Sequence, residues 1–165
     1  MKQFDLHEEN SMSGTIFPKS VTAIEDITVL RDYIHGGRGI IKLESPSNLS
    51  HNYMFGKPNN ESEFPDDYIF VYVIHDNKRF YVGLMEDDKF RLTKHSRFLE
   101  DTDIVKGAKY IVNLMNNGDK FNRRKMKLYH CGCCARCGRE LTSSDSRLRG
   151  FGKKCYNKFI SSVSD

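Results

Sequence analysis

The cysteines constrain this chain more than any other feature of its sequence. Four of the five lie within seven residues, at Cys131, Cys133, Cys134 and Cys137, and the fifth is Cys155. An even number of cysteines is typical of a secreted disulfide framework, and this chain has an odd number. Clustered thiols instead indicate a metal ligand set in a reducing compartment. The sequence therefore predicts a cytoplasmic protein with a metal-binding module near residue 134.

The spacing within the cluster predicts zinc. Cys134-x-x-Cys137 followed by Gly138 is the spacing of a zinc knuckle, in which a tight turn points two thiolates at one ion. Zinc in a structural site takes four such ligands in a tetrahedron. Cys155 can supply a third thiolate from the start of a helix predicted over residues 153–162, where the positive end of the helix dipole favours negative charge.

The fourth ligand is less constrained by the sequence. His130, Cys131 and Cys133 all lie close enough along the chain, but Cys133 is adjacent to Cys134, and neighbouring side chains rarely converge on one ion. His130 and Cys131 both remain open, and we favour His130. A redox Cys-x-x-Cys pair and a set of unliganded thiols are the alternatives. The prediction is one structural zinc ion held by His130, Cys134, Cys137 and Cys155.

Charge divides the chain at about the same place. Residues 1–102 carry 12 lysines and arginines against 17 acidic residues, and residues 103–165 carry 14 against 5. We therefore predict three parts: a polar lead-in over 1–19, an α+β core domain over 20–118, and a basic zinc-binding module over 119–165.

The basic module has the composition of a nucleic-acid-binding surface. Lysine and arginine neutralise phosphates, and interleaved aromatic rings can stack on unpaired bases. The alternatives are a solvated cationic face with Phe151 and Tyr156 packed against the zinc turn, or a surface for an acidic protein partner. The predicted nucleic-acid contacts are Arg136, Arg147, Arg149, Lys153, Lys154 and Tyr156.

The core domain has the pattern of an α+β fold with an antiparallel meander. A capping box formed by Thr22 and Glu25 predicts a helix over residues 22–34. Short apolar runs separated by turn residues predict strands over 39–43, 51–55, 68–74, 79–84 and 89–93. Apolar residues at helical spacing predict a second helix over 103–116, which we expect to cover one face of the sheet.

A longer motif surrounds the knuckle. The chain reads Tyr129-His-Cys-Gly-Cys-Cys134-Ala-Arg-Cys137-Gly-Arg-Glu-Leu-Thr142, then Ser146, then Gly150-Phe-Gly-Lys-Lys-Cys155. It resembles a short zinc-binding domain of unknown function found in many bacteriophage and plasmid proteins. Lys153 replaces the proline of that domain, and Cys131 and Cys133 stand where its pattern is variable. The positions that match are Tyr129, His130, Gly132, Cys134, Cys137, Gly138, Arg139, Leu141, Thr142, Ser146, Gly150, Phe151, Gly152 and Cys155.

The resemblance implies His130 as the fourth ligand and an origin in a phage or another mobile element. Three upstream landmarks, Gly37-Arg-Gly39, Leu43-Glu-Ser-Pro46 and Lys94-His-Ser-Arg97, extend it to about residues 20–155. That domain brings no established activity to this chain.

The sequence favours a binding protein over an enzyme. It has no P-loop, dinucleotide fingerprint or nucleophile elbow, and a zinc ion with four protein ligands has no open position for water. We expect a non-enzymatic accessory protein that binds nucleic acid in the bacterial host cytoplasm, with no membrane and no small-molecule substrate. The rival is an inhibitor of a host protein complex, such as a CRISPR nuclease or the host polymerase.

Overall fold

The computed structural model describes residues 21–47, 49–58, 65, 67–118 and 125–163. The predicted lead-in over 1–19, and residues 119–124 of the basic connector, lie outside the described residues. None of the described helices is long and apolar enough to cross a membrane. The elements in chain order are β1 (Thr22–Ala23), α1 (Ile27–His35), β2 (Arg38–Glu44), β3 (Ser50–Gly56), β4 (Ile69–His75), β5 (Lys78–Glu86), β6 (Lys89–Arg91), α2 (Asp103–Asn116), β7 (Lys127–His130), α4 (Ser144–Arg149) and α5 (Lys153–Val163).

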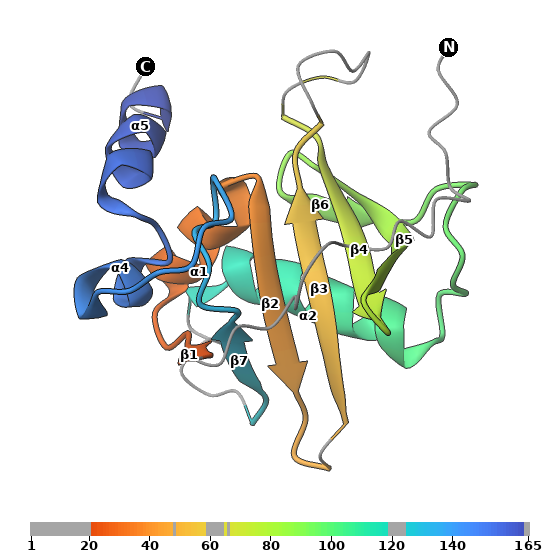
Figure 1. Cartoon of the computed structure of the whole chain (residues 1–165). Coiled ribbons are helices and arrows are strands. Elements are labelled where there is room, and N and C mark those ends of the chain that lie inside the picture. The colour runs from red at the N-terminus through yellow and green to blue at the C-terminus, as the bar shows by residue number, and fades with distance from the viewer. Residues whose placement is uncertain (1–20, 48, 59–64, 66, 119–124, 164–165) are drawn as a thin grey trace.

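The fold is α+β, as predicted. Within the described residues the strands form one antiparallel sheet of seven, in the order β1-β7-β2-β3-β4-β5-β6 (Figure 1). Strands β2 to β6 are neighbours in chain order, which confirms the meander. Asp76 and Asn77 have φ of 50° and 62°, and Asp87 and Asp88 have φ of 51° and 60°. Two-residue loops with positive φ match the twist of the strands they join, so these turns close the β4–β5 and β5–β6 hairpins.

Side chains of the sheet alternate between two apolar clusters. In β4, Val71 and Val73 belong to the larger cluster, whereas Phe70 and Tyr72 belong to the smaller one. Both α1 and α2 contribute to the larger cluster, and Figure 1 shows α2 crossing behind the sheet. A Cβ added at Gly107 would overlap the hydroxyl of Tyr53, so this glycine lets α2 lie close against β3. The second predicted helix therefore covers one face of the sheet.

The first predicted helix begins five residues later than expected. Thr22 and Ala23 form β1 and pair with His130 and Tyr129 of β7. Asp26 is the N-cap of α1, and its carboxylate accepts a hydrogen bond from the backbone N–H of Thr28 at 2.7 Å. The predicted capping box at Thr22 and Glu25 was wrong. Thr22 and Ala23 pair instead with β7, more than a hundred residues away along the chain.

The C-terminal segment shares the sheet and the core. Strand β7 lies between β1 and β2, with Ile41 opposite His130. Leu141 and Phe151 are 3% and 0% exposed and belong to the same apolar cluster as Leu30 of α1. The division into a core domain over 20–118 and a zinc module over 119–165 stays a prediction, and the two parts are packed together.

Candidate metal centre and the basic surface around it

The Cys134–Cys137 turn follows directly from β7. The N–H of Gly138 donates to the carbonyl of Cys134 at 2.9 Å, and the N–H of Cys134 donates to the carbonyl of Arg139 at 2.7 Å. Gly138 has φ of +80°, a conformation that side chains disfavour, which explains glycine at this position. This tight turn is what places two cysteine side chains together.

The third cysteine comes from α5. The Sγ atoms of Cys134, Cys137 and Cys155 all lie within 4.8 Å of one another. The N–H of Ala135 donates to the carbonyl of Gly150 at 2.8 Å, which ties the turn to the end of α4. The N–H of Gly152 points at the Sγ of Cys134 at 3.4 Å. Residues 150–152, which lie between α4 and α5, thus hold Cys155 against the turn.

The backbone around Cys134 favours its thiolate. Burial raises the pKa of this thiol, but hydrogen bonds from the backbone N–H groups of Cys137, Gly152 and Arg136 outweigh burial and lower the pKa below its usual value. Metals bind cysteine as the thiolate, so this environment suits a ligand. Cys134 is 1% exposed, whereas the other two cysteines of the group are partly exposed. Three soft sulfur donors this close together can hold a metal ion.

His130 does not join this group. Its Nε2 lies 2.6 Å from the carbonyl of Arg147, and its Nδ1 accepts a hydrogen bond from the N–H of Gly132 at 3.0 Å. Nε2 must therefore carry the proton. The ring is 1% exposed and stacks on Tyr33 with centroids 4.9 Å apart. The structure brings together three of the four predicted ligands, and the two nitrogens of the fourth bind backbone groups of Arg147 in α4 and of Gly132.

The two other cysteines lie apart from the group as well. Cys131 is 1% exposed and belongs to the smaller apolar cluster, and its Sγ lies 3.5 Å from the hydroxyl of Tyr33. That hydroxyl donates to the carbonyl of Cys133 at 2.9 Å. Burial, followed by the neighbouring Cys131 thiol, raises the pKa of Cys133 to about 12. The Cys133 thiol therefore stays protonated at neutral pH, which is unlike a metal ligand.

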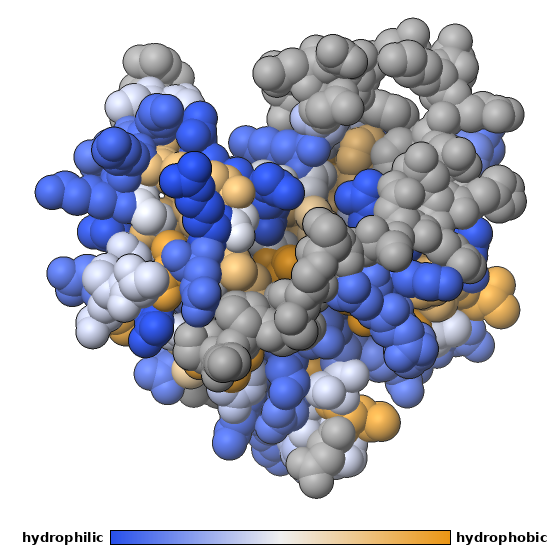
Figure 2. Space-filling model, in the orientation of Figure 1, coloured by the Kyte–Doolittle hydropathy of each residue, from blue (hydrophilic) through white to orange (hydrophobic). Residues whose placement is uncertain are grey.

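The predicted nucleic-acid contacts divide into exposed and engaged side chains. Arg136, Lys153 and Lys154 are exposed. Arg147 is half-buried, and its Nε donates to the carbonyl of Leu141 at 3.1 Å. Figure 2 shows a largely hydrophilic surface over α4 and α5, at the left of the view.

The remaining two predicted contacts pack against each other. The guanidinium of Arg149 lies over the ring of Tyr156 at 5.0 Å from its centroid. Tyr156 also packs against Phe151, with centroids 5.7 Å apart. Phe151 itself is 0% exposed. These contacts are the packing arrangement that the sequence left as an alternative to stacking on bases.

Arg38 is a candidate that the sequence argument missed. This exposed residue at the start of β2 donates from Nη1 to the carbonyl of Cys137 at 3.3 Å, and its N–H donates to the carbonyl of Ala135 at 2.7 Å. Its only signal in the sequence was its place in the Gly37-Arg-Gly39 landmark. On the other side, Nη1 of Arg136 lies 4.0 Å from the Sγ of Cys155. We call the exposed cations around the three cysteines the knuckle surface; its members are Arg38, Arg136, Arg139, Lys153 and Lys154.

Among the described residues, fold and site define an α+β protein in which the turn after β7 and helix α5 bring three cysteines together. Residues 129–160 match the model of a protein family of unknown function, DUF6011. The match runs from β7 into α5 and so includes all three cysteines of the group. No curated protein and no solved structure matches the chain.

Proposed function

We propose that the three-cysteine group holds one structural zinc ion and that the knuckle surface around it binds nucleic acid. The protein then acts as a non-enzymatic accessory factor of a bacteriophage or another mobile element, in the cytoplasm of its bacterial host. The observation that carries this proposal is the position of the cations. Arg38 and Arg136 contact residues of the group directly, and the exposed Arg139, Lys153 and Lys154 lie within two residues of one of its cysteines along the chain.

Zinc is the metal that best suits the donor set. Thiolate ligands select zinc over hard cations such as magnesium and calcium, and zinc has no redox chemistry of its own. Ligand sets rich in thiolate are typical of structural zinc sites, which take a fourth ligand besides these three. Elemental analysis of the purified protein should give about one zinc per chain, and Cys155→Ser should lower that content.

The knuckle surface should give a measurable salt dependence. Each phosphate contact with a single strand contributes a slope of about 0.7 to the fall of log K with log salt, so five contacts give a slope of about 3.5. Affinity should then fall roughly 100-fold between 50 and 200 mM salt. Fluorescence polarisation with labelled single-stranded and duplex DNA and RNA measures this slope and identifies the preferred strand.

A matched pair of variants tests where the nucleic acid binds. Lys153→Gln/Lys154→Gln removes two charges from the knuckle surface and should reduce the slope by about 1.4. Lys89→Gln/Lys106→Gln removes two exposed charges from β6 and α2 and should leave it unchanged. Equal effects of both pairs would contradict a site at the knuckle. Zinc-loaded protein that binds no strand at low salt would refute nucleic-acid binding altogether.

A second candidate function is inhibition of a host protein complex, such as a CRISPR nuclease or the host polymerase. Leu148 on α4 and Val163 on α5 are 66% and 65% exposed, and Ile160 is 42% exposed. Exposed apolar side chains that gather in one patch mark protein interfaces, and these three lie on α4 and α5. Leu148→Ser/Ile160→Ser should then abolish inhibition of the purified host enzyme while leaving strand binding intact. The acidic residues within 61–67 and 86–88 are the other surface that such an inhibitor could use, and part of that set lies outside the described residues.

A further inference from the structure

Strand β4 is buried on both faces of the sheet. Its residues Ile69–Ile74 form an unbroken apolar run, and none of the six is more than 7% exposed. Such a run is typical of a strand that is covered on both sides, whereas a sheet with one free face alternates apolar and polar residues. Helices α1 and α2 account for the face that carries Val71 and Val73. The opposite face therefore needs a cover of its own.

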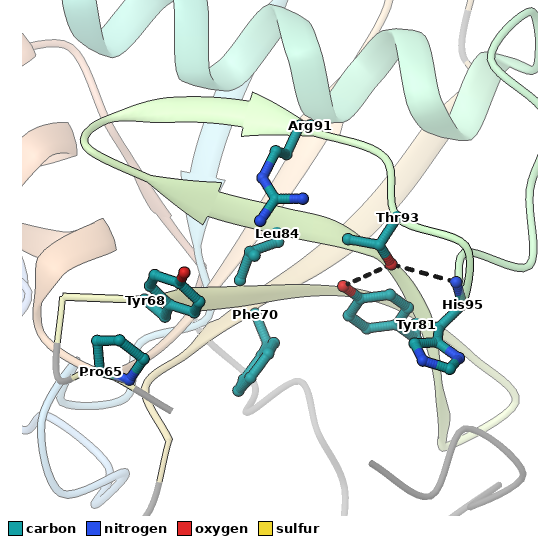
Figure 3. Close-up of a pocket in the computed structure, with 8 residues that line it drawn as sticks. All are labelled: Pro65, Tyr68, Phe70, Tyr81, Leu84, Arg91, Thr93 and His95. Carbon is teal, nitrogen blue, oxygen red and sulfur yellow. Dashed lines mark hydrogen bonds between the residues drawn. The ribbon is translucent and has the colours of Figure 1, made fainter. Parts of the chain in front are cut away.

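This opposite face is apolar across four strands. Two rows of paired residues cross it, one of Ile40, Met54, Tyr72 and Tyr81 and the next of Gly56, Phe70 and Leu84. Apart from the glycine, these residues belong to the smaller apolar cluster and are 4% to 9% exposed. Figure 3 shows the rings of Phe70 and Tyr81 on the side of the sheet away from α2. We call this surface the smaller-cluster face.

The described helices do not supply the cover. Among the described residues, the smaller cluster draws only on β2 to β5, on Tyr68, and on Cys131 and Cys133. In Figure 1, α4 and α5 lie at the left of the view, away from β3 to β5, and α2 crosses behind the sheet. Side chains stand perpendicular to a sheet, so neighbouring strands shield their sides but leave their ends open. Exposure this low therefore indicates another segment over the face.

The face also carries polar and aromatic groups that need partners. Asn52 lies two residues before Met54 on β3, so both side chains are on the same side of the sheet. The Oδ1 atom of Asn52 is buried and accepts no hydrogen bond from the described residues. Buried acceptors are almost always paired, so the cover must bring a donor such as a backbone N–H. The rings of Phe70, Tyr72 and Tyr81 are each engaged beyond the contacts among themselves.

The chain that precedes β1 begins beside this face. Thr22 pairs with His130, so the register position opposite Val21 is Cys131, a member of the smaller cluster. Strands lie about 4.8 Å apart, so the five steps from β1 to β5 span about 24 Å. An extended chain rises about 3.3 Å per residue and crosses that width in about seven residues. Residues 1–20 are long enough to cross the face.

The apolar residues of this segment suit such a crossing. Five of them, Phe4, Leu6, Met12, Ile16 and Phe17, are spread along residues 1–20. Phe17 precedes Thr22 by five residues, and about 17 Å of extended chain reaches from β1 to between β3 and β4. Pro18 restricts the residue before it to extended conformations, which keeps that reach.

We propose that residues 1–20 dock on the smaller-cluster face and are its cover, with Ile16 and Phe17 over Met54 and Tyr72. The main chain of the same segment supplies the donor for Asn52. The partner of this surface is then part of the same chain, and the segment belongs to the folded unit instead of preceding it. This inference depends neither on zinc nor on nucleic-acid binding.

A tryptophan reporter tests the docking in the full chain. The chain contains no tryptophan, so Phe17→Trp introduces a single emitter. Leu99→Trp is the matched control, because Leu99 is 75% exposed. We expect Phe17→Trp to emit at a shorter wavelength than the control and to be quenched several-fold less by acrylamide. A folded Phe17→Trp protein that is quenched as strongly as the control would overturn the proposal.

Two double variants test what the segment covers. Ile16→Ser/Phe17→Ser should undock the segment, which lowers the melting temperature and raises the fluorescence of anilinonaphthalene sulfonate several-fold as the apolar face opens. Leu49→Ser/Leu99→Ser removes apolar side chains that are already 56% and 75% exposed, and should change neither quantity. Circular dichroism shows whether the fold is kept, and the tryptophan reporter remains decisive where it is lost. Unchanged dye binding in Ile16→Ser/Phe17→Ser would refute a cover by this segment.

A peptide of residues 1–20 tests the same contact between separate molecules. Added to Ile16→Ser/Phe17→Ser, the peptide should displace the dye and restore the melting temperature, whereas a peptide with both serines should do neither. Equal effects of the two peptides would contradict recognition by Ile16 and Phe17. Burial of the Phe17→Trp reporter that depends on protein concentration would show that a second copy covers the face, and would overturn docking within one chain.

Discussion

Substitutions of His130 test whether this residue binds the metal ion or instead holds the backbone around the Cys134–Cys137 turn in place. The structure assigns both of its ring nitrogens to backbone groups, the carbonyl of Arg147 and the N–H of Gly132. His130→Ala leaves these two groups without partners in a buried place. A buried polar group without a partner costs about 1–3 kcal/mol, so the two together cost roughly 2–6 kcal/mol. For a chain of this size that lowers the melting temperature on the order of 10 °C.

Two further substitutions of His130 each keep one of its two hydrogen bonds and lose the other. The amide nitrogen of His130→Gln can reach the position of Nε2 and keep the bond to Arg147, whereas the amide oxygen of His130→Asn can replace Nδ1 and keep the bond from Gly132. Each should therefore lose about half of what His130→Ala loses. Thermal melting by circular dichroism, with zinc content measured on the same samples, checks the order.

The zinc content is the decisive readout for His130. We expect all three variants to keep about as much zinc per chain as the wild type, because the three sulfur atoms are unaffected. Cys134→Ser is the control that should lose zinc, since it removes a member of the group. A His130→Ala protein that is folded but free of zinc would refute the positioning role and restore His130 as a ligand.

Three other predictions concern pH, packing and metal removal. Burial holds the pKa of His130 below its usual value of 6.5. As the pH falls below that value, the unfolded chain binds a proton that the folded chain does not, so the free energy of unfolding falls. The difference in free energy of unfolding between wild type and His130→Gln should therefore become smaller from pH 7 to pH 5, as measured by urea titration. Gly150→Ala should lower the free energy of unfolding by about 2–4 kcal/mol in the same assay, because φ is +80° there and the added Cβ would overlap Tyr33. Gly152→Ala is the control and should be nearly neutral, because its Cβ meets nothing within 4 Å. Chelation of zinc should lower the melting temperature of the wild type but not of Cys155→Ser, and an equal decrease in both would show that the chelator acts elsewhere.

The parts of the fold that local sequence determines were predicted correctly. Helix α2 begins at Asp103 and ends at Asn116, as the apolar spacing predicts, because that signal lies within one segment. The hairpin turns at Asp76–Asn77 and Asp87–Asp88 are equally local, since their residue types tolerate positive φ. The start of α1 could not be predicted in this way, because β1 exists only through its pairing with β7.

The candidate site follows the same division. The Cys134–Cys137 pair is a local turn and was identified from spacing alone. The role of His130 depends on the carbonyl of Arg147, which reaches it only after α4 has folded back. A metal-binding histidine and a buried hydrogen-bonded one have the same spacing from the cysteines, so sequence could not separate them. Arg149 and Tyr156 were likewise among the predicted nucleic-acid contacts, although the guanidinium of Arg149 lies over the ring of Tyr156.

The Cys134–Cys137 turn is continuous with the sheet. The N–H of Cys131 donates to the carbonyl of Ile40 at 3.2 Å, and the N–H of Arg38 donates to the carbonyl of Ala135 at 2.7 Å, so hydrogen bonding between β2 and the C-terminal segment continues beyond β7 into the cysteine turn. Gly36 has no room for a side chain because Ala135 lies against it. The turn therefore packs on the junction between α1 and β2. An ion that fixes the turn also fixes this junction, so its binding free energy stabilises the sheet as well as the knuckle.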